Sequence, residues 1–315
     1  MRTIIFFILT LLPVFSFAIT KSDHPVTRVI YITFDGVRRQ EIFGHKEFMP
    51  IFWHDYAKSA VIYGAPDSNR IMEVAAKIPY SLPSYQSQMS GAVPNCLENS
   101  CSQIAIETFP ERLIKKAGLK RSDVASIASW EVIDYAFQNK LGSAFSNSGT
   151  RAMHDPYTYE IDPTMKSLNL RQIKGYKGGD TRWDKYTMAQ ALYYYKKYKP
   201  KFLWISLNDA DEYAHAGDIK HYQKTLRFYD RELDKLFKII KSEKLQQETM
   251  IIITTDHGRG LGKAWMEHES DMPDAWRTWA FVINGELANG KKDGKYVRYS
   301  TLSIRPTVEK VFGIA

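Results

Sequence analysis

Side chains of the types that bind metal ions lie in four separate places along the chain, and three of those places follow apolar runs. Ser81, within KIPYSLPSYQSQMSG, adds a hydroxyl that can act as a nucleophile. Carboxylates together with imidazoles suit zinc, and a serine beside two zinc ions suits phosphoryl transfer. The candidate metal ligands are Asp35, Asp211, His215, Asp256, His257 and His268.

The apolar runs before these residues indicate how they would be positioned. RVIYITF, DVASIAS, KFLWISL, TMIIITT and TWAFVIN are short, β-branched or aromatic, and predict buried strands. Helical spacing in PERLIKKAG, DKYTMAQALYYYKKY, HYQKTLRFYDRELDKLFKIIKSEK and the closing SIRPTVEKVFGIA alternates with them. This alternation predicts an α/β fold with a largely parallel sheet sandwiched between helices. Ligands bind at the carboxyl edge of such sheets, where Asp35, Asp211 and Asp256 would emerge.

Each candidate residue also has a purely structural alternative. An aspartate after a strand is often a helix N-cap, and Asp35 before Gly36 suits a turn. Ser81 suits an N-cap ahead of Pro83. Asp211 and His215 share a face only if their segment is helical. The ordered set taken together favours a metal site over chance.

Composition predicts one large globular domain. Hydrophobic residues make up 44% of the chain and charged residues 25%. We expect a catalytic domain over 19–315, with a polar, weakly periodic loop excursion at about 138–180. The net charge of +8 helps to attract anionic substrates, but it also describes many ordinary solvated surfaces. No nucleic-acid-binding motif accompanies the lysines, so a dedicated nucleic-acid partner is not expected.

The first 18 residues, MRTIIFFILTLLPVFSFA, have the composition of a cleaved secretory signal. An uncleaved N-terminal anchor is the alternative; after cleavage no membrane span would remain. We therefore predict a periplasmic or secreted protein. In an oxidising compartment, Cys96 and Cys101 would form a structural disulfide, because two thiols without nearby histidines make a poor zinc site.

The order of motifs resembles that of the alkaline phosphatase superfamily. FDG is followed by a Ser-x-Pro segment, then D-x-x-x-H, DHG and a final histidine, and the likeness extends from Asp35 to the closing helix. It is greatest to the type I phosphodiesterase/nucleotide pyrophosphatase-like and related bacterial phosphatase branch. Relatives usually have glycine after the final histidine, whereas this chain has Glu269.

The resemblance implies two Zn²⁺ ions, although other divalent metals are possible. Asp211, His215 and His268 would bind one ion. Asp35, Asp256 and His257 would bind the other, together with the oxygen of Ser81, the implied nucleophile. Ser84 stands where phosphodiesterase relatives often carry a phosphate-binding asparagine, so it is a candidate substrate-binding residue.

We therefore expect an exported zinc-dependent hydrolase of phosphoric esters that works through a phosphoserine intermediate. The sulfatase motif Cys/Ser-x-Pro-x-Arg differs here because Tyr85 replaces the arginine, yet a sulfatase-like hydrolase stays an alternative. An inactive exported binding protein on the same scaffold is another. Phosphomonoesters need additional cations, for which Arg38, Arg182 and Lys263 are candidates. Since nothing in the sequence brings these near the metals, phosphodiester or pyrophosphate substrates are slightly favoured.

Overall fold

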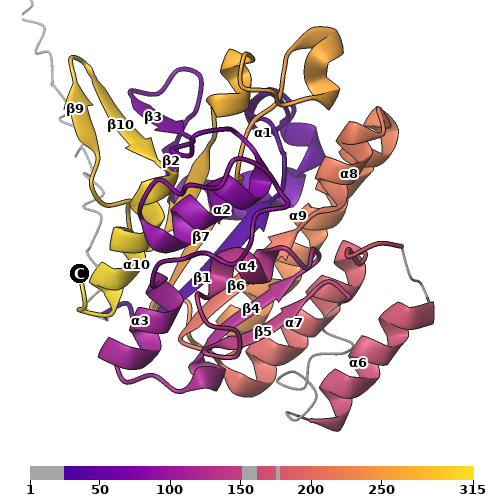
Figure 1. Ribbon diagram of the computed structural model, residues 1–315, viewed down its shortest axis with the longest axis vertical. Helices are drawn as coiled ribbons and strands as arrows, with labels where there is room; N and C mark the ends of the chain where they lie inside the picture. Colours follow the sequence, from indigo (N-terminus) through magenta and orange to yellow (C-terminus); the bar gives the residue numbers. More distant parts are fainter. Residues whose placement is uncertain (1–24, 151–161, 175–177) are drawn as a thin grey trace, which may run out of the picture.

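A central sheet and two helical layers make up the protein, as seen in a computed structural model that describes residues 25–150, 162–174 and 178–315 (Figure 1). The sheet has seven strands in the order β2-β8-β7-β1-β6-β4-β5, and only β8 runs antiparallel to its neighbours. Its strands are β1 (Arg28–Phe34), β2 (Ala60–Tyr63), β4 (Val124–Ala128), β5 (Phe145–Ser148), β6 (Phe202–Leu207), β7 (Thr249–Thr254) and β8 (Ala280–Ile283).

Helices cover both faces of this sheet (Figure 1). A smaller sheet has the strand order β3-β10-β9, and its strand β3 lies near β2 of the large sheet (Figure 1). Its strands are β3 (Arg70–Glu73), β9 (Lys291–Asp293) and β10 (Tyr296–Ser300). The α-helices are α1 (Arg39–Gly44), α2 (Ser81–Ser90), α3 (Phe109–Lys116), α4 (Ile133–Phe137), α6 (Pro163–Lys174), α7 (Asp184–Tyr198), α8 (Asp209–His215), α9 (Ile219–Ser242) and α10 (Ile304–Val311).

Alternation of side chains along the strands creates two hydrophobic cores. Ile30 and Ile32 of β1 point to the face covered by α7 and α9, whereas Val29 and Tyr31 point to the face covered by α2, α3, α4 and α10. Successive side chains of a strand lie on opposite faces, so a central strand buried on both sides must be apolar throughout. The predicted sandwich of a largely parallel sheet between helices is therefore confirmed.

The segment at 138–180 differs from the expected loop excursion. Where it is described, it contributes the edge strand β5 and the helix α6. The strand reads FSNS, and its polar side chains are buried because they have hydrogen-bond partners: Ser146 donates to Asp134, and Asn147 lies within hydrogen-bond distance of Gln190. An apolar pattern therefore does not mark this strand. Residues 151–161 and 175–177 lie outside the described part of the chain.

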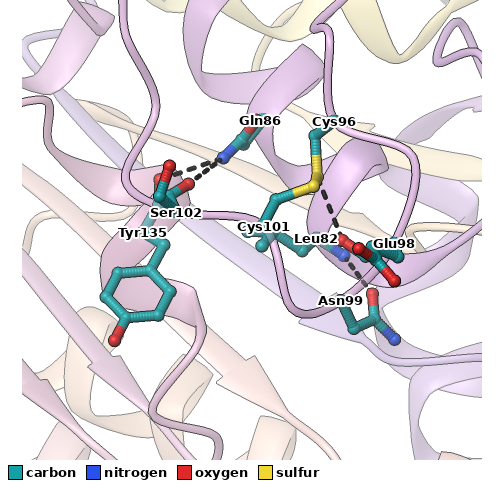
Figure 2. Close-up of a disulfide and its surroundings, with 8 residues drawn as sticks. All are labelled: Leu82, Gln86, Cys96, Glu98, Asn99, Cys101, Ser102 and Tyr135. Atoms are coloured by element: carbon teal, nitrogen blue, oxygen red, sulfur yellow. Dashed lines mark hydrogen bonds between the residues drawn. A yellow bond between two sulfur atoms is a disulfide. The ribbon is translucent and has the colours of Figure 1, made fainter.

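The predicted signal sequence, residues 1–18, also lies outside the described residues. Among the described helices, none combines the length and apolar composition needed to cross a lipid bilayer. Cys96 and Cys101 form the expected disulfide, with Cα atoms 5.7 Å apart (Figure 2). It closes a short loop between α2 and α3.

We expect alkylation of the native protein without reductant to add no adduct to either cysteine, as measured by intact mass. Replacing both with serine should lower the free energy of unfolding by about 2 kcal/mol. The effect is modest because so short a disulfide loop restricts the entropy of the unfolded chain only slightly. Two adducts on folded protein would contradict the disulfide.

Candidate metal centre

The carboxyl ends of three adjacent parallel strands bring distant acidic residues together. β1 pairs with β6 on one side and with β7 on the other, with Phe34 beside Leu207 and Thr33 beside Thr254. Asp35 directly follows β1, and Asp256 lies two residues beyond β7. After β6 the chain enters α8, which carries Asp211 and His215. The sequence prediction of a common sheet edge agrees with this arrangement.

Asp211, His215 and His268 form a first cluster. Asp211 and His215 lie one turn apart on α8, with Oδ2 and Nε2 3.3 Å apart. His268 comes from the loop after β7, and its Nε2 lies 3.2 Å from Nε2 of His215. One potential ligand atom from each of the three lies within 4.8 Å of the others. The structure therefore brings together the triad predicted for one metal ion.

Asp35, Asp256 and His257 form a second cluster, which is buried. Nε2 of His257 lies 3.3 Å from Oδ2 of Asp256 and 3.7 Å from Oδ1 of Asp35. Asp211 borders this cluster as well, because it also offers an oxygen within 4.8 Å of ligand atoms of Asp35 and His257. The rings of His257 and His268 stack with centroids 3.9 Å apart. The two predicted triads thus adjoin and share Asp211 at their boundary.

The donor set fits divalent cations. Oδ2 of Asp256 is buried and has no hydrogen-bond partner among the described residues, although an unpaired buried charge is costly. Burial, followed by the nearby Asp256 carboxylate, raises the pKa of Asp35 well above its ordinary value. A cation between these carboxylates would remove that cost.

Two of the three histidines, His257 and His268, are also oriented as metal ligands would be. Nδ1 of His257 lies 2.8 Å from the carbonyl oxygen of Gly258, and Nδ1 of His268 lies 3.0 Å from that of Pro79. Donation to these carbonyls holds the proton on Nδ1 and leaves a lone pair on each Nε2, facing the clusters. Burial lowers the pKa of both imidazoles, which favours the neutral, metal-binding form.

Glu269, the departure from the usual motif after His268, has a structural explanation. Its carboxylate accepts a hydrogen bond of 2.6 Å from the hydroxyl of Tyr80, and the Tyr80 ring packs edge-on against His268 with centroids 5.2 Å apart. The glutamate thereby fixes a ring that supports the histidine.

Ser81 lies at the start of α2, beside the second cluster. Its Oγ is 3.3 Å from Oδ1 of Asp35 and 3.2 Å from Nε2 of His257. The N-cap alternative for Ser81 is wrong, because Tyr80 is the N-cap and Ser81 is the first residue of the helix. The hydroxyl is therefore directed at the candidate ligands.

Ser84 does not have the surroundings expected of a substrate-binding residue. It is fully buried, and its Oγ donates a hydrogen bond of 2.6 Å to the main-chain carbonyl of Asp256. One turn of helix separates it from Ser81, so it faces the strand end beneath the site. Its contact orients the Asp256 backbone and leaves the hydroxyl no free direction toward a substrate.

Of the three cations proposed from the sequence, Arg38 and Arg182 have other partners. Arg38 pairs with Glu41, and Lys263 is exposed. Arg182 is fully buried, where it donates to Thr187 and to the carbonyl of Asn147, and burial lowers its pKa to about 9. None of these contacts directs a cation at the two clusters.

Arg259 is the residue that the sequence reasoning missed. Its buried guanidinium pairs with Oδ1 of Asp211, and its Nε donates a hydrogen bond of 3.2 Å to the carbonyl of Gly36. Gly36 has φ of +60°, where other residues are strained, and a Cβ there would lie 2.2 Å from Oδ1 of Asp211, so a larger residue would displace that carboxylate. The position of Arg259, two residues after His257 in a run of polar residues ending a buried strand, was the available signal.

Comparison with known proteins agrees with this geometry. The Metalloenzyme superfamily profile matches residues 100–261, about half of the chain. No curated protein sequence matches the chain significantly. Among solved structures, an alkaline phosphatase superfamily protein from Vibrio parahaemolyticus is 12% identical, with a TM-score of 0.61 over 93% of this chain and 68% of the other.

Two further structures share the fold. BT1596, a 2-O GAG sulfatase, is 14% identical, with a TM-score of 0.61 over 92% of this chain and 71% of the sulfatase. TAB5 alkaline phosphatase, solved with Mg bound, is 12% identical, with a TM-score of 0.53 over 92% of this chain and 99% of the other. The chain belongs to the Metalloenzyme superfamily, and its fold is similar to that of alkaline phosphatase. Divalent metal use follows from that membership and from the donor set.

Replacing Arg259 with methionine, which keeps most of the volume, should weaken metal binding about tenfold to a hundredfold, as loss of a group that orients a ligand typically does. Calorimetric titration of metal into the apo protein measures this. Lys263→Met, on the exposed turn, is the matched control and should bind as the wild type does. Unchanged affinity in a folded Arg259→Met variant would mean that Arg259 does not orient Asp211.

Proposed function

We propose that this protein is an exported zinc-dependent phosphoric ester hydrolase that works through a phosphoserine intermediate. The observation that carries the proposal is the position of the Ser81 hydroxyl, within 3.3 Å of Asp35 and 3.2 Å of His257. A serine is a weak nucleophile at neutral pH unless a neighbouring base or metal activates it. Few structural roles would require a hydroxyl beside a buried carboxylate and a buried imidazole.

Two zinc ions suit the donors best. The two adjoining clusters offer three imidazoles and three carboxylates, which match the nitrogen and oxygen ligands of zinc. Asp211, His215 and His268 would hold one ion. Asp35, Asp256 and His257, with Ser81, would hold the other. When bound, the ions would neutralise phosphate charge, lower the pKa of the Ser81 hydroxyl and stabilise the leaving oxygen.

The chain's own residues would then direct the reaction. The Ser81 oxygen forms a bond to phosphorus while the bond to the leaving oxygen breaks, and water later cleaves the phosphoserine. Tyr85 donates a hydrogen bond of 3.0 Å to Oδ2 of Asp35, which fixes the carboxylate whose other oxygen faces Ser81. Ser84 and Gly36 hold Asp256 through its carbonyl and its carboxylate.

Tyr85 also bears on the sulfatase alternative. It stands where the sulfatase motif has an arginine, yet it is fully buried, packs against Trp204 and donates to Asp35. A phenol that supports a metal-ligand carboxylate cannot supply the cation expected there. This supports a phosphate ester over a sulfate ester as substrate.

The engagement of the cations supports phosphodiesters or pyrophosphates over phosphomonoesters. A monoester dianion requires positive charge beyond the metals, whereas Arg38 is paired with Glu41 and Arg259 with Asp211. A diester monoanion needs less compensation. The proposed partner is accordingly a small phosphorylated compound, with no dedicated nucleic-acid partner.

An inactive binding protein on this scaffold is the second candidate. Such proteins usually lack a ligand or the nucleophile, whereas all of the expected side chains are present here. Export is supported by the disulfide at Cys96–Cys101, which an oxidising compartment favours.

Purified protein should hydrolyse bis-p-nitrophenyl phosphate faster than p-nitrophenyl phosphate, and p-nitrophenyl sulfate slowest, with activity dependent on added zinc. Release of p-nitrophenol measures all three rates. Preference for the sulfate ester would contradict the proposal and favour the sulfatase alternative. If the zinc-loaded protein hydrolysed none of the three esters, the inactive binding protein would be favoured.

Ser81→Ala should lower the rate by several orders of magnitude while metal content stays near that of the wild type, because the remaining side chains still bind the ions. Ser84→Ala should cost at most tenfold to a hundredfold, since it loses one hydrogen bond to the Asp256 backbone. Turnover and metal content by mass spectrometry test both. If Ser81→Ala were active and Ser84→Ala inactive, Ser81 would not be the nucleophile.

A further inference from the structure

The disulfide loop reaches the first turn of the helix that carries Ser81. Asn99, inside the loop closed by Cys96 and Cys101, accepts a hydrogen bond of 2.9 Å at Oδ1 from the main-chain nitrogen of Leu82 (Figure 2). Leu82 directly follows Ser81. Asn99, seventeen residues after Leu82, therefore caps the helix at the residue next to the candidate nucleophile.

The first turn of α2 needs this external partner. The initial N–H groups of a helix have no partner within the helix, and an N-cap side chain usually supplies one. Tyr80, the N-cap here, makes no side-chain cap, and Pro83 has no N–H to offer. The Leu82 N–H is thus satisfied by Asn99, which fixes the peptide that joins Leu82 to Ser81.

The loop itself is held mainly at its ends. Leu97 is 55% exposed, and Glu98 and Ser100 are exposed as well, so the loop buries little apolar surface of its own. The disulfide closes one end covalently, with Cys96 buried.

Beyond the disulfide, a hydrogen bond from α2 anchors the returning chain. Gln86 donates from Nε2 to the carbonyls of Ser102, at 3.2 Å, and Tyr135, at 3.3 Å (Figure 2). The same helix that receives the Asn99 cap thus holds the chain that follows Cys101, so loop and helix are tied together at two points.

From these contacts we propose that Asn99 is a positioning residue for Ser81, and that the Cys96–Cys101 disulfide keeps it in place. The proposal rests on the proposed role of Ser81 as nucleophile. A dithiol can reduce this disulfide: the two cysteines become thiols, and the dithiol is oxidised to its own disulfide. Reduction would free the loop, so that the Leu82 N–H loses its acceptor and the Ser81 backbone is held less firmly. Apart from Ser81 itself, the candidate metal ligands belong to other elements and would stay in place.

Two variants of Asn99 separate capping from volume. Asn99→Leu removes the acceptor, whereas Asn99→Asp keeps one and remains a good cap. Hydrogen exchange at the Leu82 amide should accelerate roughly fivefold or more in Asn99→Leu, as expected for loss of one hydrogen bond, and stay slow in Asn99→Asp. Glu98→Ala, in the same loop, is the matched control and should exchange as the wild type does.

The Cys96→Ser/Cys101→Ser variant tests the disulfide. We expect the same faster exchange at Leu82, a fall in kcat of about ten- to a hundredfold with little change in KM, and wild-type metal content. Adding Asn99→Leu to this variant should give little further loss, because both changes remove the same contact. Reducing the folded, metal-free wild type with dithiothreitol should reproduce the faster exchange at Leu82 without mutation.

Slow exchange at Leu82 in the serine variant would overturn the proposal. A variant that lost metal while its kcat stayed unchanged would overturn it as well. The exchange measurement needs no turnover. If Leu82 responds as expected but no ester is hydrolysed by the wild type, the proposed function fails while the capping contact stands.

Discussion

β1 lies between β6 and β7 in parallel register, and the candidate metal centre depends on that pairing. The three strands end at the same edge, so the chain leaves each of them carrying an acidic side chain toward one small volume. The strands are buried on both faces, and a register slip of one residue would reverse their side chains between the two cores. The side-chain packing in the two cores, which fixes the register, therefore also fixes the spacing of Asp35 and Asp256.

Burial of the three carboxylates is energetically unfavourable, and hydrogen bonds and an ion pair from the surrounding residues offset part of that free energy. Tyr85 and Gly36 donate hydrogen bonds to Asp35 and Asp256, and Arg259 pairs with Asp211. The remaining oxygen of Asp256 has no hydrogen-bond partner among the described residues, and a bound cation would satisfy it. These contacts orient the candidate ligands, and so account for a run of polar residues in an otherwise apolar interior.

α2 connects this centre with the rest of the fold through polar contacts. Every residue of the helix is buried, although its sequence SLPSYQSQMS is largely polar. Ser81 faces Asp35, Ser84 holds the Asp256 carbonyl, and Gln88 lies within hydrogen-bond distance of Tyr31 on β1. The disulfide loop reaches the same helix from outside through Asn99. Side-chain hydrogen bonds therefore position the candidate nucleophile, together with the apolar packing of Leu82, Tyr85 and Met89.

The sequence alone determined the parallel sheet, its long helices and the set of ligand types, because strand and helix periodicities and the order of motifs are local properties. It could not reveal β5 or α2, whose buried side chains are polar and are satisfied only by partners distant in the chain. The role of Ser84, the engagement of the cations and the importance of Arg259 were likewise decided by tertiary structure. A hydrogen bond between Arg259 and Asp211, 48 residues apart, has no local signature. The residue types follow from the sequence, whereas their directions depend on what the fold places opposite them.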